Sequence, residues 1–92
     1  MHELANVCDH EYAAQLQPIL LAEIQAGQNI ALDASNVDEI STVFVQLVES
    51  AAQSARLAEL GFAVHNPSEA FIEGYEDLGL FPNLMQIFAE PG

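Results

Sequence analysis

Lysine is absent from this 92-residue sequence, and Arg56 stands alone against 14 acidic residues. The formal net charge is −13. Nucleic acids and anionic lipid head groups are bound through basic side chains that replace counterions, so we expect neither as a partner. A basic protein partner is the natural expectation.

Cysteine is nearly as scarce. Cys8 is the only one, so no internal disulfide can form, and this usage suits a reducing compartment. No apolar run approaches the length of a membrane span, and no charged region followed by an apolar stretch opens the chain. We therefore expect a cytoplasmic protein without direct membrane insertion.

Hydrophobic residues, in contrast, make up 51% of the chain, and the mean hydropathy is +0.20. That is far too apolar for a disordered acidic tail, and the length predicts a single domain over residues 1–92. A core of this size sits near the lower limit for independent stability. A partner surface would help, and there is little room for a deep substrate cleft.

Two long helical patterns follow from the apolar spacing. In residues 9–27 apolar residues recur at every fourth position, with Gly27 as the stop. Pro18 predicts either a kink or a ragged first turn, with the regular helix beginning near Gln17. Residues 41–60 predict the longest helix, ended by Gly61. Its apolar arc contains Phe44, Leu47, Val48, Ala51, Ala55 and Ala58.

Short strands are predicted around residues 4–7, 28–35 and 62–67. Ser68 is placed to cap a third helix that ends at Gly79 and turns Ala70, Phe71, Ile72, Tyr75 and Leu78 towards the core. Residues 80–92 leave a last strand and a further helical turn open. Strands separated by helices predict an α/β fold with a mostly parallel short sheet and helices mainly on one face.

The runs NIALDASNVDEISTVFVQLVESAA, GFAVHNPSEAF and EDLGLF resemble the STAS domain family in their order and in their residues. This family includes bacterial anti-anti-sigma factors and subunits of lipid-transport and anion-transport systems. The resemblance covers about residues 27–81. The antiparallel N-terminal strand usual in the family is mostly missing, so the chain looks like a trimmed single STAS-like domain.

In that family a Ser or Thr at the start of the central helix is phosphorylated by a kinase that doubles as an anti-sigma factor, and the modified domain then releases its partner. Aligned on Ile40, the resemblance puts Thr42 in the phosphoacceptor place. Ser41 replaces the family aspartate, and Phe44 replaces the family glycine. The implied partner surface consists of Asp38, Glu39, Ser41, Thr42, Val43, Val45 and Gln46.

A structural role competes with the chemical one at this corner, because either Ser41 or Thr42 can cap the helix. Phe44 is near the centre of the apolar arc and is expected in the core, although aromatic residues also serve as binding anchors. Val43 and Val45 lie at the two margins of the arc and Leu57 on its polar side. We expect these three side chains to be exposed for contact.

Other candidate sites are weaker. Cys8, His10 and His65 lack a recognised metal spacing, and we expect no metal and no cofactor. No nucleophile–base–acid set can be assembled, so an enzyme is not expected. The third helix also carries a row of acids that is either a solvated face or a docking surface for a basic partner. They are Glu69, Glu73, Glu76 and Asp77.

The function expected from these residues is a regulatory protein-binding module that resembles an anti-anti-sigma factor in signal transduction and transcription regulation. It would bind a kinase or anti-sigma-type partner and be switched at Thr42. The alternative is a constitutive accessory subunit or scaffold of a lipid-transport ATPase or a chemosensory complex, without phosphorylation. Small-molecule binding stays open as a third reading, and so does a homodimer.

Overall fold

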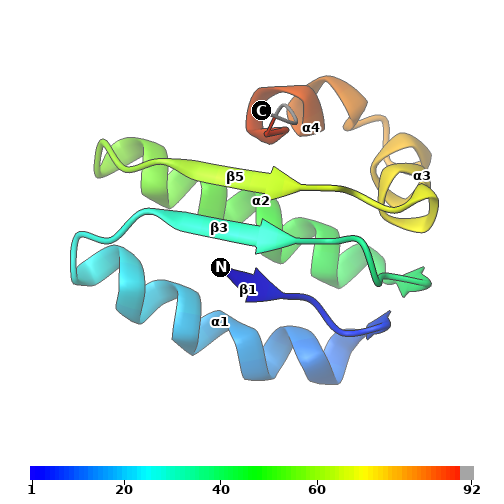
Figure 1. Cartoon of the computed structure of the whole chain (residues 1–92), viewed down its shortest axis with the longest axis horizontal. Helices are drawn as coiled ribbons and strands as arrows, with labels where there is room; N and C mark the ends of the chain where they lie inside the picture. Colours follow the sequence, from blue (N-terminus) through cyan, green and yellow to red (C-terminus); the bar gives the residue numbers. More distant parts are fainter. Residues whose placement is uncertain (90–92) are drawn as a thin grey trace.

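The computed structural model describes residues 1–89, and the last three residues of the open segment 80–92 lie outside the described part. Strands and helices alternate along most of the chain (Figure 1). In order they are β1 (His2–Glu3), β2 (Val7–Cys8), α1 (His10–Gln25), β3 (Ile30–Asp33), β4 (Glu39–Ile40), α2 (Thr42–Leu57), β5 (Phe62–His65), α3 (Glu69–Asp77) and α4 (Phe81–Ile87).

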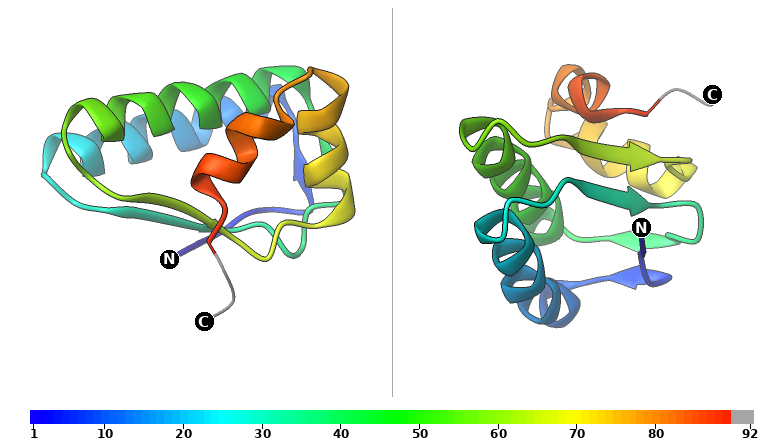
Figure 2. Two further views of the ribbon diagram at one scale, coloured as in Figure 1. Left: turned by 90° about the horizontal axis from the view of Figure 1, so that it is seen from above. Right: turned by 60° about the vertical axis from the view of Figure 1, so that its left-hand side comes forward.

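The strands form two small parallel sheets, in the orders β1-β3-β5 and β2-β4. Helices α1 and α2 lie together on one face of the larger sheet, and no helix of the described chain covers its other face (Figures 1 and 2). The predicted α/β class, the parallel short sheet and the one-sided helical cover are confirmed. The two-stranded sheet was not anticipated.

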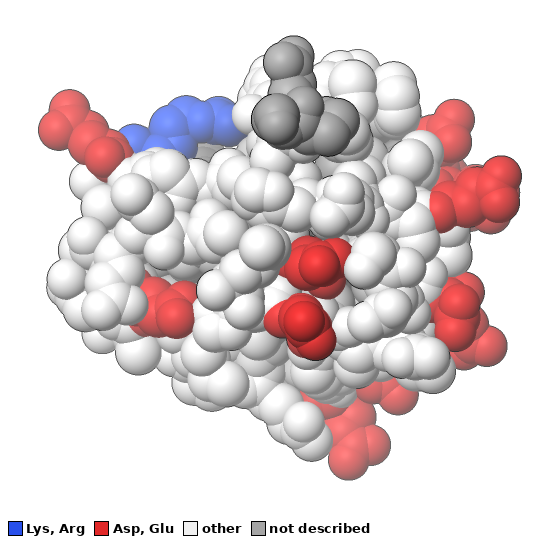
Figure 3. Space-filling view, in the orientation of Figure 1, with Lys and Arg blue, Asp and Glu red and all other residues white. Residues whose placement is uncertain are grey.

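The core lies between the larger sheet and the two long helices. Ile30 and Leu32 of β3 and Val64 of β5 point into it and are at most 3% exposed. Ala31 and Asp33 alternate with them and are half-buried on the uncovered face. Acidic side chains lie over this face and around the rim of the molecule (Figure 3).

The first residues depart from the prediction. A single strand was expected over residues 4–7, but residues 2–3 pair with β3 and residues 7–8 pair with β4. The chain therefore crosses from one sheet to the other in between, and Leu4 is buried there at 2% exposure. His2 is anchored to α1, since its Nε2 lies 2.8 Å from Glu23 Oε2.

Helix α1 begins at His10, well before Gln17, where one of the two alternatives placed the start of the regular helix. Asp9 caps it by accepting from the Tyr12 N–H at 2.9 Å, and the helix runs from His10 through Pro18 to Gln25. A ragged first turn with the regular helix beginning near Gln17 is therefore wrong. Gly27 follows the helix with φ of 75°, the left-handed conformation expected of a helix stop.

Helix α2 ends at Leu57, three residues before the predicted end. Glu59, not Gly61, adopts the left-handed conformation, with φ of 59°. The Leu60 N–H then donates to the Ala55 carbonyl at 2.8 Å and closes the helix end. Ala58 consequently lies outside the helix and is exposed, so its predicted place in the apolar arc is wrong.

The C-terminal segment is helical, as one of the two alternatives allowed. Leu84 and Ile87 of α4 are buried, and Phe88 then forms a parallel bridge to Val64 of β5. In α3, Ser68 is the predicted cap, accepting from the Phe71 N–H at 3.1 Å. Leu78, expected in the core, is 38% exposed because it follows the last helical residue.

Candidate functional site

The start of α2 is organised by Ser41. Its Oγ accepts from the Phe44 N–H at 3.1 Å, and its own N–H donates to the Cys8 carbonyl at 2.9 Å. Ser41 is thus both the N-cap of the helix and the residue that fastens the helix start to β2. Of the two hydroxyls that competed for capping, Ser41 is the one used.

Thr42 is the first residue of α2 and is exposed. The preceding corner is also exposed and is held from behind by Asn6. The Asn6 carbonyl accepts from the N–H groups of Asp38 at 2.7 Å and Glu39 at 3.1 Å, while the Asn6 side-chain amide donates to Asp38 Oδ2 at 3.3 Å. The backbone of this acidic corner is therefore fixed beside the helix start, and the Asp38 carboxylate is held as well.

The expected contact residues separate into two groups. Val43 is 43% exposed, Leu57 is 81% exposed and Gln46 is exposed, as a contact surface requires. Val45, expected at an exposed margin, is only 1% exposed, which corrects its place in the partner surface. A Cβ on Gly74 of α3 would lie 3.6 Å from Val45 Cγ2, so α3 covers this side of α2.

Phe44 lies in the core, as predicted, and is fully buried. Its ring stacks on that of Tyr12 from α1, with ring centroids 5.6 Å apart and planes 3° from parallel. Aromatic stacking of this kind contributes beyond the area that it buries. The side chain that replaces the family glycine therefore fills the space between the two helices and does not cover the surface around Thr42.

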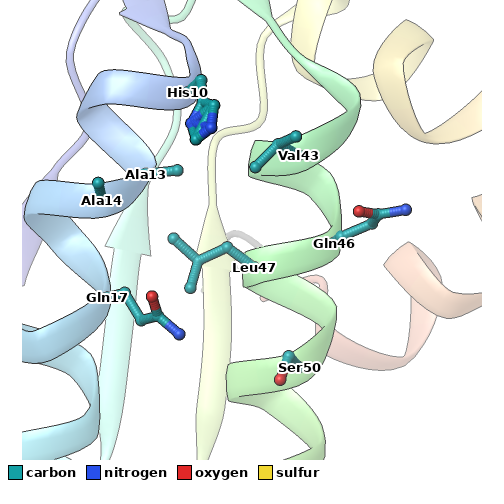
Figure 4. A pocket seen from close by; sticks show the side chains of 8 residues that line it. All are labelled: His10, Ala13, Ala14, Gln17, Val43, Gln46, Leu47 and Ser50. Carbon is teal, nitrogen blue, oxygen red and sulfur yellow. The ribbon is translucent and has the colours of Figure 1, made fainter.

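A groove of about 310 Å³ opens between α1 and α2 beside this corner (Figure 4). Val43, which directly follows Thr42, lines it from α2 together with Gln46 and Leu47. The α1 wall bears His10 at its near end. The remaining lining residues are Ala13, Ala14, Gln17 and Ser50. The lining carries no Asp, Glu, Lys or Arg, although the corner next to it is acidic.

The α1 wall of this groove was not anticipated. Its residues stand three and four positions apart, which puts them on one edge of the helix. The sequence shows this spacing, but small and polar residues such as Ala14 and Gln17 are typical of a solvent-exposed helix face and do not predict a groove. Only the position of α1 alongside α2 makes them one side of a groove.

The soft metal-ligand residues are dispersed. Cys8 is fully buried, and its burial raises the pKa of the thiol to about 11, so the thiol stays protonated at neutral pH. His10 lies in the groove and His65 at the end of β5. Among residues 1–89, no three His, Cys, Asp or Glu side chains are arranged to hold a metal ion.

The acids of α3 are all exposed: Glu69, Glu73, Glu76 and Asp77. Exposure fits a solvated face and a docking surface equally. Ser68, the neighbour of this row, is fully engaged, since its Oγ also donates to the Val37 carbonyl at 2.6 Å. The Ser68 hydroxyl therefore both caps α3 and ties its start to Val37.

Comparison with protein-family models, curated proteins and solved structures finds no match. The STAS resemblance therefore rests on the residues quoted above. In the part of the chain that the structure describes, no helix is both long enough and apolar enough to cross a membrane.

Because Ser41 caps the helix and Thr42 does not, alanine substitutions at these two adjacent positions should lower the free energy of unfolding by different amounts. Ser41→Ala should lower the free energy of unfolding by about 1 kcal/mol, because the Phe44 N–H loses its acceptor. Thr42→Ala should change it by less than about 0.5 kcal/mol, because the side chain is exposed and alanine suits a helix. Urea unfolding followed by circular dichroism measures both, and equal losses would contradict the assignment of Ser41 as the cap.

Proposed function

We propose that this domain is a regulatory module that binds a protein partner at the start of α2 and is switched by phosphorylation of Thr42. The binding surface comprises the acidic corner and the adjoining groove, which together are called the α2 corner here. Its residues are Asp38, Glu39, Ser41, Thr42, Val43 and Gln46, with the groove lining of α1.

One observation carries the proposal: Ser41 provides the helix cap, and Thr42 stands exposed directly after it. Because capping is already provided by Ser41, the stability of the helix start does not require Thr42 to be a hydroxyl residue. The position is also open to a kinase, since Phe44 is buried and Asp38 and Glu39 are exposed.

The chemistry of the α2 corner indicates the kind of partner. The groove offers apolar side chains, notably Val43 at 43% exposure and the half-buried Leu47. The corner offers two carboxylates, and the chain as a whole carries a net charge of −13. A partner segment with apolar anchors flanked by Lys or Arg is complementary to both, and the charge would also speed its association.

A phosphate on Thr42 would meet the unpaired N–H groups and the positive dipole end of α2. It would find no Lys or Arg side chain close by. Arg56 is 14 residues further along the same helix, which corresponds to roughly 21 Å of helical rise. Within this chain we assign to the phosphate only the interaction with the start of α2. The phosphate therefore stays available to a partner.

The proposal is tested by incubating the protein with a candidate sigma-system kinase, nucleotide and magnesium and then measuring the intact mass. We expect the wild type to gain one phosphoryl group, Thr42→Ala to gain none, and Ser41→Ala to retain the modification. No gain on the wild type, or an undiminished gain on Thr42→Ala, would reject the switch.

A second candidate is the constitutive accessory subunit of a lipid-transport ATPase or a chemosensory complex. It is favoured by Ser41, which replaces the family aspartate and is committed to the cap. Co-purification of the untagged native protein distinguishes the two. A sigma-system kinase supports the first function, and a transporter ATPase or receptor-array protein supports the second.

A further inference from the structure

A second cleft, of about 430 Å³, lies between α2 and α4 and shares Gln46 and Ser50 with the groove beside Thr42. Unlike the groove beside Thr42, it is mainly polar and contains charges of both signs. Its polar lining comprises Gln46, Glu49, Ser50, Gln53, Arg56, Asn83 and Gln86, and its apolar lining comprises Ala52, Leu80 and Ile87. The volume falls at the small end of the range for small-molecule pockets, roughly 300–1,000 Å³.

Arg56 is the only Lys or Arg residue of the chain, and it lies in this cleft. Its Nη2 donates to Gln86 Oε1 of α4 at 3.2 Å. A guanidinium has five donors, and this bond uses one of them. Among residues 1–89 the guanidinium forms no ion pair with a carboxylate, although the chain has 14 acidic residues.

Glu49 provides the opposite charge two helical turns earlier on α2. Its Oε2 accepts from Asn83 Nδ2 at 3.0 Å, but its Oε1 is buried without a hydrogen-bond partner among the described residues. The fully buried Tyr75 Oη is likewise without an aligned partner there. Burial, the nearby charge of Glu49 and an interaction of the phenol with the Glu49 side chain raise the pKa of Tyr75 well above its usual range. Tyr75 is thus a donor for the buried side of Glu49, while Glu49 Oε2 can accept a further hydrogen bond from a ligand beside that of Asn83.

We propose that the cleft between α2 and α4 binds a small polar, uncharged α-amino acid, with its ammonium on Glu49 and its carboxylate on Arg56. The two head groups are held by Asn83 and Gln86, which are three residues apart on α4. The Cβ atoms of helical residues three positions apart are about 5–6 Å apart, so the two head groups are brought to neighbouring positions along the cleft. An ammonium and a carboxylate joined through one carbon can reach both.

The overall charge favours a zwitterion over an anion. A protein with a net charge of −13 repels free anions, and Arg56 alone must offset that repulsion. A simple cation would be attracted by the net charge but would leave Arg56 unused. The carboxamides of Gln46 and Gln53 and the hydroxyl of Ser50 can bond a neutral polar side chain as donors or acceptors.

Proton–nitrogen correlation spectra of the whole protein, titrated separately with L-serine, L-asparagine and L-glutamine, test this site. We expect at least one of them to shift amide signals of α2 and α4 saturably below about 10 mM. N-acetyl-L-glutamine lacks the ammonium and L-glutaminamide lacks the carboxylate. Both derivatives should bind at least about tenfold more weakly than L-glutamine. If L-serine or L-asparagine binds instead, the N-acetyl and amide derivatives of that amino acid should be weakened in the same way.

Arg56→Gln is the matched variant, because Arg56 is exposed and its loss should leave the fold intact. It should weaken binding at least about tenfold, and Glu49→Gln should do the same. The Thr42→Ala variant should bind the amino acid normally, so failure here is distinct from failure of the phosphorylation switch. The absence of shifts with all three acids, or equal shifts in Arg56→Gln, would overturn the proposal.

Discussion

Replacing Phe44 with alanine is expected to lower the free energy of unfolding by about 3–5 kcal/mol. The side chain is fully buried, and it stacks on Tyr12 between α1 and α2. The substitution removes both the buried apolar area and the stacked pair, and it leaves a cavity where two helices meet. A domain of this size has a total stability of about 5–15 kcal/mol at most, so the variant would lose a large part of it.

Equilibrium urea unfolding followed by circular dichroism measures the effect, since the chain has no tryptophan to report by fluorescence. Val43→Ala is the matched control one position earlier, where the side chain is 43% exposed, and it should cost less than about 1 kcal/mol. If the two variants lost the same stability, Phe44 would not be the core contact described above.

The behaviour of Phe44 illustrates what the sequence could predict. The apolar period of α2 placed this residue near the centre of the buried arc, and the structure confirms it. The cap Ser68 and the helix stops Gly27 and Gly79 were predicted for the same reason, because each depends on neighbours a few residues away. Local patterns also sufficed for the parallel α/β class.

The features that were missed depend on distant parts of the chain. Val45 is buried because α3 packs over it, and α3 begins 24 residues later. The split of the N-terminal segment into β1 and β2 depends on which of two later strands each half pairs with. The polar cleft needs α4, whose helical form was left open. The spacing of seven residues puts Glu49 and Arg56 on one face of α2, but only α4 makes that face one wall of a cleft.

Gly74 also depends on a distant contact. Here helix propensity alone predicts the wrong sign for the change in stability on substitution by alanine. Within a helix, glycine is normally about 1 kcal/mol less favourable than alanine, so Gly74→Ala in α3 should be stabilising. In this structure a Cβ at position 74 would collide with Cγ2 of Ile40, the last residue of β4. We therefore expect Gly74→Ala to destabilise the protein by about 1–3 kcal/mol, because α3 or β4 must move.

The collision can be isolated with a double-mutant cycle. Ile40→Ala removes the Cγ2 atom, so adding Gly74→Ala to that variant should be neutral or stabilising, with a coupling energy of about 1–3 kcal/mol between the two sites. Gly61→Ala is the control, since a Cβ there lies at ordinary contact distance, 3.5 Å, from the Asn29 side chain. Urea unfolding of the four variants and the wild type gives every term. A Gly74→Ala variant that is as stable as Gly61→Ala would show that α3 does not press on the strand leading into Ser41. Because Ile40 directly precedes the cap of α2, a confirmed collision would make the packing of α3 one of the contacts that fix the position of Thr42.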